Sequence, residues 1–201
     1  MPGPRSIEGY AIVSADGMLA DAGRRIPPPL VVEADQKFFH DSLEHAAVVV
    51  HGRHSHEGGP RADSRYRLVV TTRVPALGPH PTRPKALLWN PKGTTLAEAW
   101  ASLGAPDGML AVIGGPNVNQ LFLDSGIGKF DVFHLSRVAD VRLPGGVPVF
   151  PGIGPKRTPE DVLAANGLKP GPERVLDATA GATLVTWRRR CCAVPAAGIQ
   201  D

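Results

Sequence analysis

The segment Ala111–Leu123, AVIGGPNVNQLFL, constrains the fold more than any other part of the chain. Its β-branched apolar start is typical of the end of a buried strand. Gly114 and Gly115 then permit backbone conformations that a Cβ forbids, and they let another molecule approach the main chain closely. Pro116 suits a first helical turn, and the apolar residues after it recur with the spacing of one helix face. The segment therefore predicts a strand, a glycine turn and a helix in succession.

This glycine turn is a candidate phosphate site. A turn at a helix N-terminus presents free N–H groups and the positive end of the helix dipole, which suits a phosphate. A tight turn without a ligand is the other interpretation of the same residues. Neither common phosphate motif fits, because Asn119 and Gln120 stand near the place of the third glycine of the dinucleotide fingerprint, and the Gly-Lys-Ser/Thr of the P-loop is absent. A phosphate at Gly114–Gly115 would need a different kind of loop.

The composition is that of an ordinary globular domain. The 201 residues are enough for one domain with a sizeable core, and 42% hydrophobic with 20% charged residues fit that class. A net charge of +3, with no Lys/Arg run longer than Arg188–Arg190, argues against a nucleic-acid partner. We therefore expect a single domain over residues 1–190 and a C-terminal tail over 191–201.

The lack of a recognisable targeting segment and the pattern of cysteines favour the cytoplasm as the expected location. No apolar stretch has the length of a membrane span, and the opening residues lack the apolar core of a signal peptide. Cys191 and Cys192 are adjacent and poorly suited to a structural disulfide. We expect a cytoplasmic protein that binds a small molecule and no membrane, with a homodimer left open.

Predicted strands and helices alternate along the chain, which favours an α/β fold. We expect a mixed, mainly parallel central sheet flanked by helices, with an antiparallel C-terminal hairpin. The expected strands are Glu8–Ser14, Ala46–His51, Leu68–Thr72, Ala86–Trp89, Met109–Ile113 and Asp131–Val138, and the hairpin is Arg174–Ala178 with Thr183–Arg188. The expected helices are Ala34–Leu43 and Thr95–Leu103, and the expected long loops are Ala15–Leu30 and Gly145–Pro155.

Three predicted strands end in polar or glycine-bearing residues, at Gly52-Arg53, Thr71–Arg73 and Gly114-Gly115. Open α/β sheets bind ligands outside the carboxyl ends of their strands. An arginine at such a point offers a planar, permanently charged fork for a phosphate. Each segment alone is compatible with a solvated loop, but one phosphate-rich ligand could touch all three, which indicates a nucleotide.

A histidine cluster is the other candidate site. His51, His54, His56 and Glu57 lie within seven positions. Their spacing is not that of a zinc signature, and no distant Cys/His set completes it. We therefore expect no metal, and interpret these histidines as strand-end or solvent-facing residues.

Several of these segments together resemble one superfamily. GRHSHEG, SRYRLVVTTR and AVIGGPNVNQLFL occur in the order and spacing of the dihydrofolate reductase-like superfamily. SADGMLA after the opening strand, and FLDSGIGKFDVFHLS after the glycine pair, look like the reductase domain of riboflavin-biosynthesis deaminase-reductases. The resemblance covers about residues 7–152 and implies the dihydrofolate reductase-like fold.

The resemblance implies NADPH as the cofactor, held by four short segments. The residues implied at its pyrophosphate are Gly114, Gly115, Pro116, Asn117 and Val118. Those implied at its other phosphates are Gly52, Arg53 and Ser55, and those at the adenosine 2′-phosphate are Thr71, Thr72 and Arg73. Leu19 and Ala20 resemble the loop beside the nicotinamide.

The resemblance also implies a substrate site. Asp35 stands where the folate enzymes carry an acidic residue that protonates or polarises the pterin, and Ser136 resembles its hydroxyl partner. Phe38 and Phe39 would line the pocket, and Arg65 is near the position that meets the folate carboxylate. A first-turn carboxylate favoured by the helix dipole is the alternative interpretation of Asp35.

The function expected on these grounds is an NADPH-dependent reductase that transfers hydride to a small heterocycle, either ribosylaminopyrimidine-like or pterin-like. The alternatives are dihydrofolate reductase proper, a nucleotide-binding module without turnover, and a metal-dependent hydrolase built on the histidines. We expect no zinc deaminase domain of the kind found in many riboflavin enzymes within these 201 residues, since no H-x-E with a P-C-x-x-C partner occurs in them.

Overall fold

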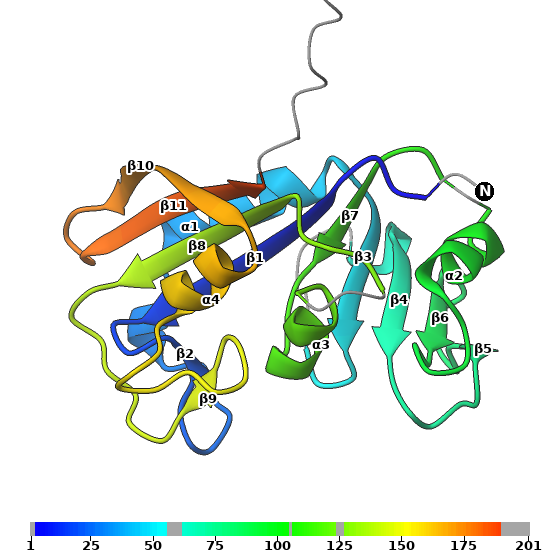
Figure 1. Ribbon diagram of the computed structural model, residues 1–201, viewed down its shortest axis with the longest axis horizontal. Helices are drawn as coiled ribbons and strands as arrows, with labels where there is room; N and C mark the ends of the chain where they lie inside the picture. Colours follow the sequence, from blue (N-terminus) through cyan, green and yellow to red (C-terminus); the bar gives the residue numbers. More distant parts are fainter. Residues whose placement is uncertain (1–2, 56–61, 105, 124–126, 190–201) are drawn as a thin grey trace, which may run out of the picture.

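The fold is built on one large sheet. The computed structural model describes residues 3–55, 62–104, 106–123 and 127–189, so the expected tail with Cys191 and Cys192 lies outside the described residues. Nine strands form the sheet in the order β10-β11-β8-β1-β7-β3-β4-β6-β5, and β2 pairs with β9 separately (Figure 1). The strands are β1 (Ile7–Ser14), β2 (Met18–Ala20), β3 (Ala46–Gly52), β4 (Tyr66–Val70), β5 (Leu77–Pro79), β6 (Ala86–Trp89), β7 (Met109–Val112), β8 (Val132–Val138), β9 (Val147–Pro148), β10 (Leu168–Asp177) and β11 (Ala182–Arg189).

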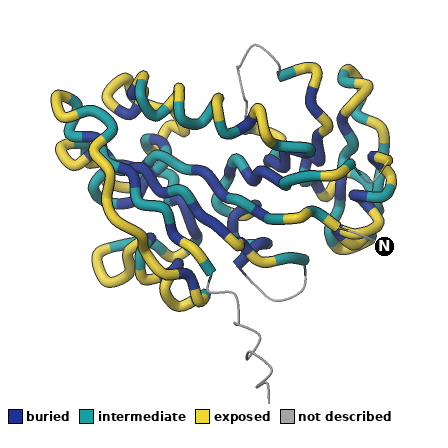
Figure 2. The backbone as a smooth tube through the Cα atoms, turned by 90° about the horizontal axis from the view of Figure 1, so that it is seen from above, coloured by how far each residue is buried: buried dark blue, intermediate teal, exposed yellow. Residues whose placement is uncertain are grey.

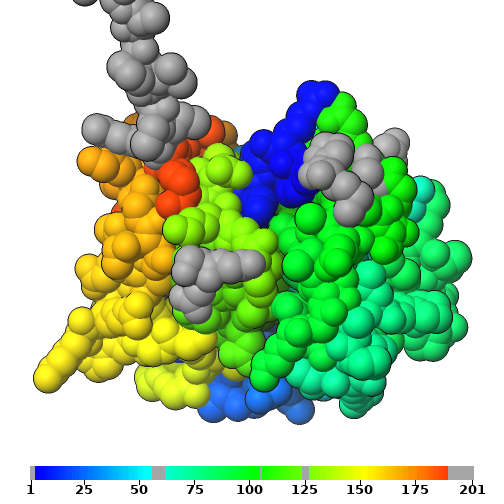
Figure 3. All heavy atoms as spheres, turned by 45° about the vertical axis from the view of Figure 1, so that its right-hand side comes forward, coloured from blue at the N-terminus to red at the C-terminus, as the bar shows by residue number. Residues whose placement is uncertain are grey.

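The sheet is mixed and mainly parallel, as expected. β1 lies between β7 and β8 and is parallel to both, and β3, β4 and β6 continue the parallel part beyond β7. The C-terminal hairpin β10–β11 adds two antiparallel strands to β8, and β5 closes the other edge antiparallel to β6. In Figure 3 the blue start of the chain accordingly lies between the green and the yellow-green parts of the molecule. The parallel strands therefore bring their carboxyl ends to a common edge.

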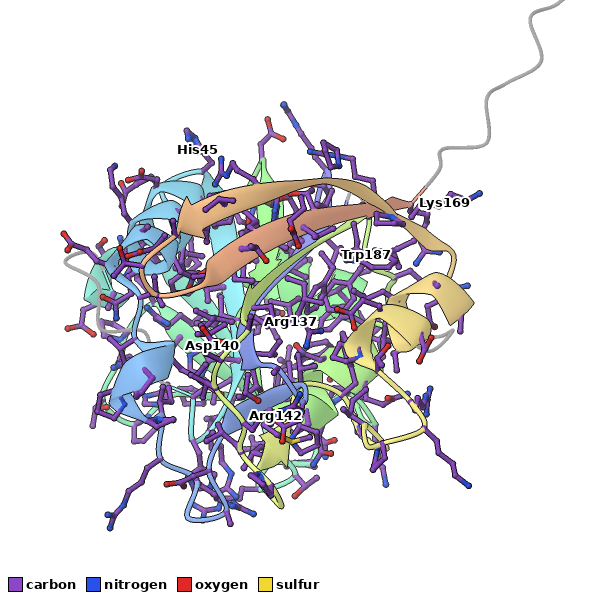
Figure 4. The ribbon with its side chains drawn as sticks, turned by 90° about the vertical axis from the view of Figure 1, so that its left-hand side faces the viewer. His45, Arg137, Asp140, Arg142, Lys169 and Trp187 are labelled. Carbon is purple, nitrogen blue, oxygen red and sulfur yellow. The ribbon has the colours of Figure 1, made fainter. Side chains whose placement is uncertain are left out.

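Helices cover both faces of the sheet. The helices are α1 (Glu33–Leu43), α2 (Leu96–Ser102), α3 (Pro116–Leu121) and α4 (Pro159–Ala165), with short 3-10 turns at Pro28–Leu30 and Ala62–Ser64. α1 packs its apolar side chains with Tyr10 on one face, whereas buried residues of α2, α3 and α4 share a larger core on the other. Figure 2 shows buried residues concentrated along the strands and exposed ones in the loops. Figure 4 shows Arg137 and Trp187 on the side of the sheet that faces α4, and Arg137 bonds Glu160 of that helix.

The starts of α2 and α4 are determined locally. Thr95 accepts a hydrogen bond from the backbone N–H of Glu98, and the Glu98 carboxylate accepts one from the backbone of Thr95. Thr158 and Asp161 form the same reciprocal pair at α4. Such a capping box satisfies two N–H groups that a helix start leaves without partners. The box at Thr158 is visible in the sequence, although α4 is not among the helices that we expected.

Two expected loops contain strands, so the expectation of unbroken loops is wrong at β2 and β9. The two strands are far apart in sequence and pair only with each other. The carboxylate of Asp16 accepts the N–H of Leu143 at 3.0 Å, and the N–H of Val149 donates to the carbonyl of Gly17 at 3.1 Å. Strands of two or three residues carry little pattern, so only this long-range pairing makes them strands.

Candidate functional site

A pocket of about 960 Å³ lies at the carboxyl ends of β3, β4, β6 and β7 and extends to α1, β1 and β8. Of the eighteen residues that we singled out from the sequence, sixteen line it, and the exceptions are Arg65 and Arg73. The fold thus brings together segments that are more than a hundred residues apart in the sequence. Their functional roles stay predictions, whereas their common location is a feature of the structure.

The glycine pair forms an open cradle at the middle of the pocket. Gly114 has φ +114° and Gly115 has φ +88°, a region that side chains with a Cβ rarely adopt. A Cβ built on Gly114 would meet no atom within 4 Å, and one on Gly115 would lie 3.6 Å from the Ser55 hydroxyl. The N–H of Gly52 faces the carbonyl of Gly114 at 3.4 Å, which joins the two glycine turns. The free space above this backbone is large enough for a ligand to lie against it.

Hydroxyl and cationic groups surround one end of the pocket. Thr71 is buried and accepts a hydrogen bond from the backbone N–H of Arg73 at 3.1 Å, while Arg53 is exposed at the rim. Lys92 also lines the pocket, from the turn that follows β6. An arginine and a lysine that line one end of a pocket favour an anionic ligand there.

Asp35 and Ser136 meet at the other end. Asp35 lies in the first turn of α1, and Ser136 is a buried residue of β8 opposite Ile12 of β1. Burial raises the pKa of the Asp35 carboxyl above its ordinary value, and a hydrogen bond from the Ser136 hydroxyl offsets part of that rise. A carboxyl group with a raised pKa exchanges protons closer to neutral pH than an exposed one does.

Aromatic rings line the pocket around this carboxyl. Phe38 and Phe39 follow Asp35 on α1, and Tyr10 and His134 are opposite each other in the β1–β8 register. The Tyr10 ring stacks on His134 with centroids 4.8 Å apart. Burial, and next the negative charge of Glu8, raise the pKa of the Tyr10 hydroxyl above its usual range. This end of the pocket therefore suits a flat ring with polar edges.

Two sequence-predicted residues lie away from the pocket wall. Arg65 is buried in an ion pair with Glu44 at 2.6 Å. Arg73 is exposed in the turn after β4 and does not line the pocket, although Thr71 and Thr72 beside it do. Arg65 has this location because it precedes the start of β4, at the edge of the sheet opposite the pocket, where Glu44 follows the end of α1.

Other pocket residues were not predicted from the sequence. Asn90 and Lys92 follow strand β6 in the same way as Thr71 follows β4, so the strand-end argument could have found them. Tyr10 and His134 lie inside strands and carry no local signal. Further polar residues of this group include Arg24, His54 and Asn119.

The histidine cluster is only partly described. His51 is buried and its Nδ1 atom lies 2.8 Å from the carbonyl of Gly52, whereas His56 and Glu57 lie outside the described residues. Within residues 3–55, 62–104, 106–123 and 127–189, no three His, Cys, Asp or Glu side chains gather as a metal site requires. In the same part of the chain, none of the helices has the length and apolar character needed to cross a membrane.

Comparisons with known proteins give matches among solved structures. No protein-family model and no curated protein sequence matches this chain. A protein of Shewanella sp. PV-4, provisionally named a riboflavin biosynthesis protein, is similar with a TM-score of 0.62 and 20% identity over 92% of this chain and 99% of that one. A dihydrofolate reductase of Enterococcus faecalis, solved with NADP(H) and RAB-propyl, is similar with a TM-score of 0.61 and 16% identity over 95% of this chain and 100% of that one.

A third solved structure is longer than this chain. It is a diaminohydroxyphosphoribosylaminopyrimidine deaminase/5-amino-6-(5-phosphoribosylamino)uracil reductase of Thermotoga maritima, with a TM-score of 0.62 and 15% identity. The match covers 94% of this chain but 57% of that one. At identities this low the three likenesses establish the fold, and it is the fold that the sequence led us to expect.

The half-buried carboxyl of Asp35 predicts that the variant Asp35→Asn is more stable than the wild type at neutral pH. Because the pKa of Asp35 is raised above its ordinary value of 3.8, the folded chain holds a proton there that the unfolded chain releases. The stability that this group contributes is present below pH 3.8 and is lost as the pH rises through the raised pKa. Asp35→Asn should therefore melt at a higher temperature than the wild type at neutral pH, with the difference vanishing in acid.

Asp41→Asn is the matched control, since Asp41 is an exposed carboxylate of the same helix in an i,i+4 pair with Lys37. It should change the melting temperature little or lower it slightly. Equal melting temperatures of Asp35→Asn and the wild type at pH 7 would contradict a desolvated carboxyl at position 35.

Proposed function

We propose that this chain, which has the dihydrofolate reductase-like fold, is an NADPH-dependent reductase of a small heterocyclic substrate. The observation that carries the proposal is the single pocket with two unlike ends. One end joins the glycine cradle to hydroxyl and cationic side chains, and the other joins a half-buried carboxyl to a serine hydroxyl among aromatic rings. A dinucleotide and a flat polar ring are the two ligands that these ends suit.

The described residues fit NADPH on physical grounds. A Cβ at Gly114 would project into empty space, so the backbone there is open to a pyrophosphate. Ser55, Gly52 and Arg53 stand next to this cradle, and Thr71, Thr72 and Lys92 stand where an adenosine phosphate would extend. Leu19 and Ala20 of β2 would lie against the nicotinamide, which supplies a hydride when bound.

The substrate end would bind the ring, exclude water and hold a proton. Asp35 would keep a proton nearer neutral pH than an exposed aspartate and present it to a ring nitrogen or carbonyl. Ser136 donates a hydrogen bond to Asp35 and so orients the carboxyl. Phe38 and Phe39 would stack against the ring and limit the access of water.

The position of Arg65 favours a substrate other than folate. The family resemblance implied a contact between this residue and the folate carboxylate. Arg65 instead forms an ion pair with Glu44 and does not line the pocket. A ribosylaminopyrimidine or a related small heterocycle needs no such contact. One similar solved structure is named for riboflavin biosynthesis and another for a phosphoribosylaminouracil reductase, which agrees with this preference.

NADPH should bind at least about tenfold more tightly than NADH, because a charge-assisted contact to the 2′-phosphate contributes about 1.5–3 kcal/mol. Lys92→Gln should weaken NADPH binding and leave NADH binding unchanged. Lys85→Gln is the control, since Lys85 lies over the Tyr66 ring outside the pocket. Calorimetric titration with both cofactors measures these affinities, and equal affinities in the wild type would refute the 2′-phosphate assignment.

A variant of Gly115 tests whether the glycine cradle binds the cofactor. Gly115→Ala introduces a Cβ at φ +88°, a strained backbone that costs on the order of 1–3 kcal/mol. Relief of that strain should move the cradle and lower NADPH affinity tenfold or more. Gly104→Ala is matched, because Gly104 has φ +86° and no atom within 4 Å of a Cβ, but it lies outside the pocket. It should lose similar stability and keep its affinity, and parallel behaviour of both variants would remove the cradle from the site.

Turnover tests the whole proposal. NADPH oxidation should be measured over a panel of pterins and ribosylaminopyrimidines, and we expect one of the latter to be reduced. Asp35→Asn should keep NADPH affinity and lower turnover by about a hundredfold or more. Unchanged turnover in this variant would take Asp35 out of the reaction, and NADPH binding without turnover on any ring would favour a nucleotide-binding module.

A further inference from the structure

A short turn, residues 15–17, leads from β1 into β2, the strand that forms one wall of the pocket. The hydroxyl of Ser14 donates to the carboxylate of Asp16 at 2.6 Å, and the N–H of Met18 donates to the Ser14 hydroxyl oxygen at 3.0 Å. These bonds lie within the turn and determine its shape. The position of β2 therefore depends on what holds the turn against the rest of the molecule.

Arg137 of β8 binds this turn from the face of the sheet that α4 covers (Figure 4). Its Nη1 atom donates to the carbonyl of Ala15 at 2.7 Å and to that of Ser14 at 3.3 Å. Its Nη2 atom donates to the carboxylate of Glu160, in the first turn of α4. Because a guanidinium is planar and presents its donors in a fixed fork, one side chain holds the turn and the helix in a set relation.

Gly17 brings the turn into direct contact with the same helix. It has φ +83°, and a Cβ built on it would lie 2.9 Å from the Cγ atom of Pro159, the first residue of α4, and 3.0 Å from the Cγ2 atom of Ile153. There is no room for a side chain between the turn and the helix. The start of α4 is thus joined to the turn by the polar bonds of Arg137 and by close packing at Gly17.

We propose that this α4 contact, formed by Arg137, Glu160 and Gly17, positions β2 for the nicotinamide half of the cofactor. The inference rests on the proposed function, in which Leu19 and Ala20 lie against the nicotinamide. None of the three residues of the contact lines the pocket, so they are positioning residues. The adenosine half would lie against the ends of β3, β4 and β6, beyond β7 in the sheet, and should not depend on the α4 contact.

The experiment compares two ligands in the full chain by calorimetric titration. One is NADPH, and the other is 2′-phosphoadenosine diphosphoribose, which has the same phosphates but lacks the nicotinamide ring. Arg137→Met should weaken NADPH binding by about fivefold or more, because a wall that is no longer held must be ordered when the ring binds. The affinity for the ligand without the ring should stay unchanged.

Arg189→Met is the matched control for the loss of an arginine. Arg189 likewise donates to two backbone carbonyls, those of Phe130 at 2.9 Å and Asn166 at 2.8 Å, but it does so at the C-terminal end of α4 and outside the pocket. It should lower the melting temperature about as much as Arg137→Met does and leave both affinities unchanged. A loss of NADPH affinity in Arg189→Met equal to that in Arg137→Met would mean that general loosening acts, and would overturn the proposal.

Gly17→Ala disturbs the same contact by steric means, so it should reproduce the selective loss of NADPH affinity. Its control is Gly167→Ala, since Gly167 has φ +82° and a Cβ on it would lie 3.2 Å from the Nη1 atom of Arg189, at the other end of α4. The control should lose similar stability and keep both affinities. This second pair of variants tests the proposal by itself if Arg137→Met fails to fold.

The wild type distinguishes this inference from the proposed function. If it binds neither ligand, the reductase proposal is wrong and the inference falls with it. If it binds NADPH but Arg137→Met and Gly17→Ala weaken both ligands equally, or weaken neither, the α4 contact does not position the nicotinamide wall and the reductase proposal is unaffected. Wild-type affinities that are equal for the two ligands would also overturn the inference, because the ring would then gain nothing from that wall.

Discussion

The parallel pairing of β1 with β7 on one side and β8 on the other is the constraint on which the rest of the structure depends. It places Gly9 opposite Val112 and Phe133, so the carboxyl ends of the three strands lie together. β7 then delivers the glycine cradle and β8 delivers Ser136 to the same edge of the sheet. Because a parallel connection must cross over the sheet, α1 lies on one face between β1 and β3 and brings Asp35 to that edge as well.

At the candidate site, the burial that suits Asp35 to proton exchange also lowers the stability of the folded chain. Burial raises the pKa of Asp35, which makes the ionised carboxyl unfavourable in the folded chain at neutral pH. The fold offsets part of this cost with the Ser136 hydroxyl, and it satisfies Glu8 more fully, through His134 and Tyr10. One carboxyl is therefore held ready to accept a proton, while the other, deeper along β1, stays ionised. Two acidic groups on one face of the sheet differ in this way because their hydrogen-bond partners differ in number and charge.

The pocket wall near the expected nicotinamide depends on contacts between distant segments. β2 holds Leu19 and Ala20 against the pocket because β9 pairs with it and Asp16 accepts the N–H of Leu143. The buried amide of Asn119 donates to the carbonyl of Val149 at 3.0 Å, which ties α3 to the same strand pair. The cradle and the loop opposite it are thus anchored to one another. A ligand that fills the space between them would contact elements whose relative positions are already determined.

The sequence by itself determined which strands end in glycine or polar residues that could bind a ligand. β-branched runs followed by glycine or polar residues predict Gly52, Thr71 and Gly114 at strand ends, because burial and backbone freedom are local properties that a few adjacent residues express. Only the tertiary structure decided which partners the remaining side chains meet. Arg65 was expected at a substrate and pairs with Glu44, and His134 carried no local signal in the sequence but lines the pocket. The physical reason is that an ion pair or a ring stack depends on strand register and helix placement, and these follow from the packing of the whole chain.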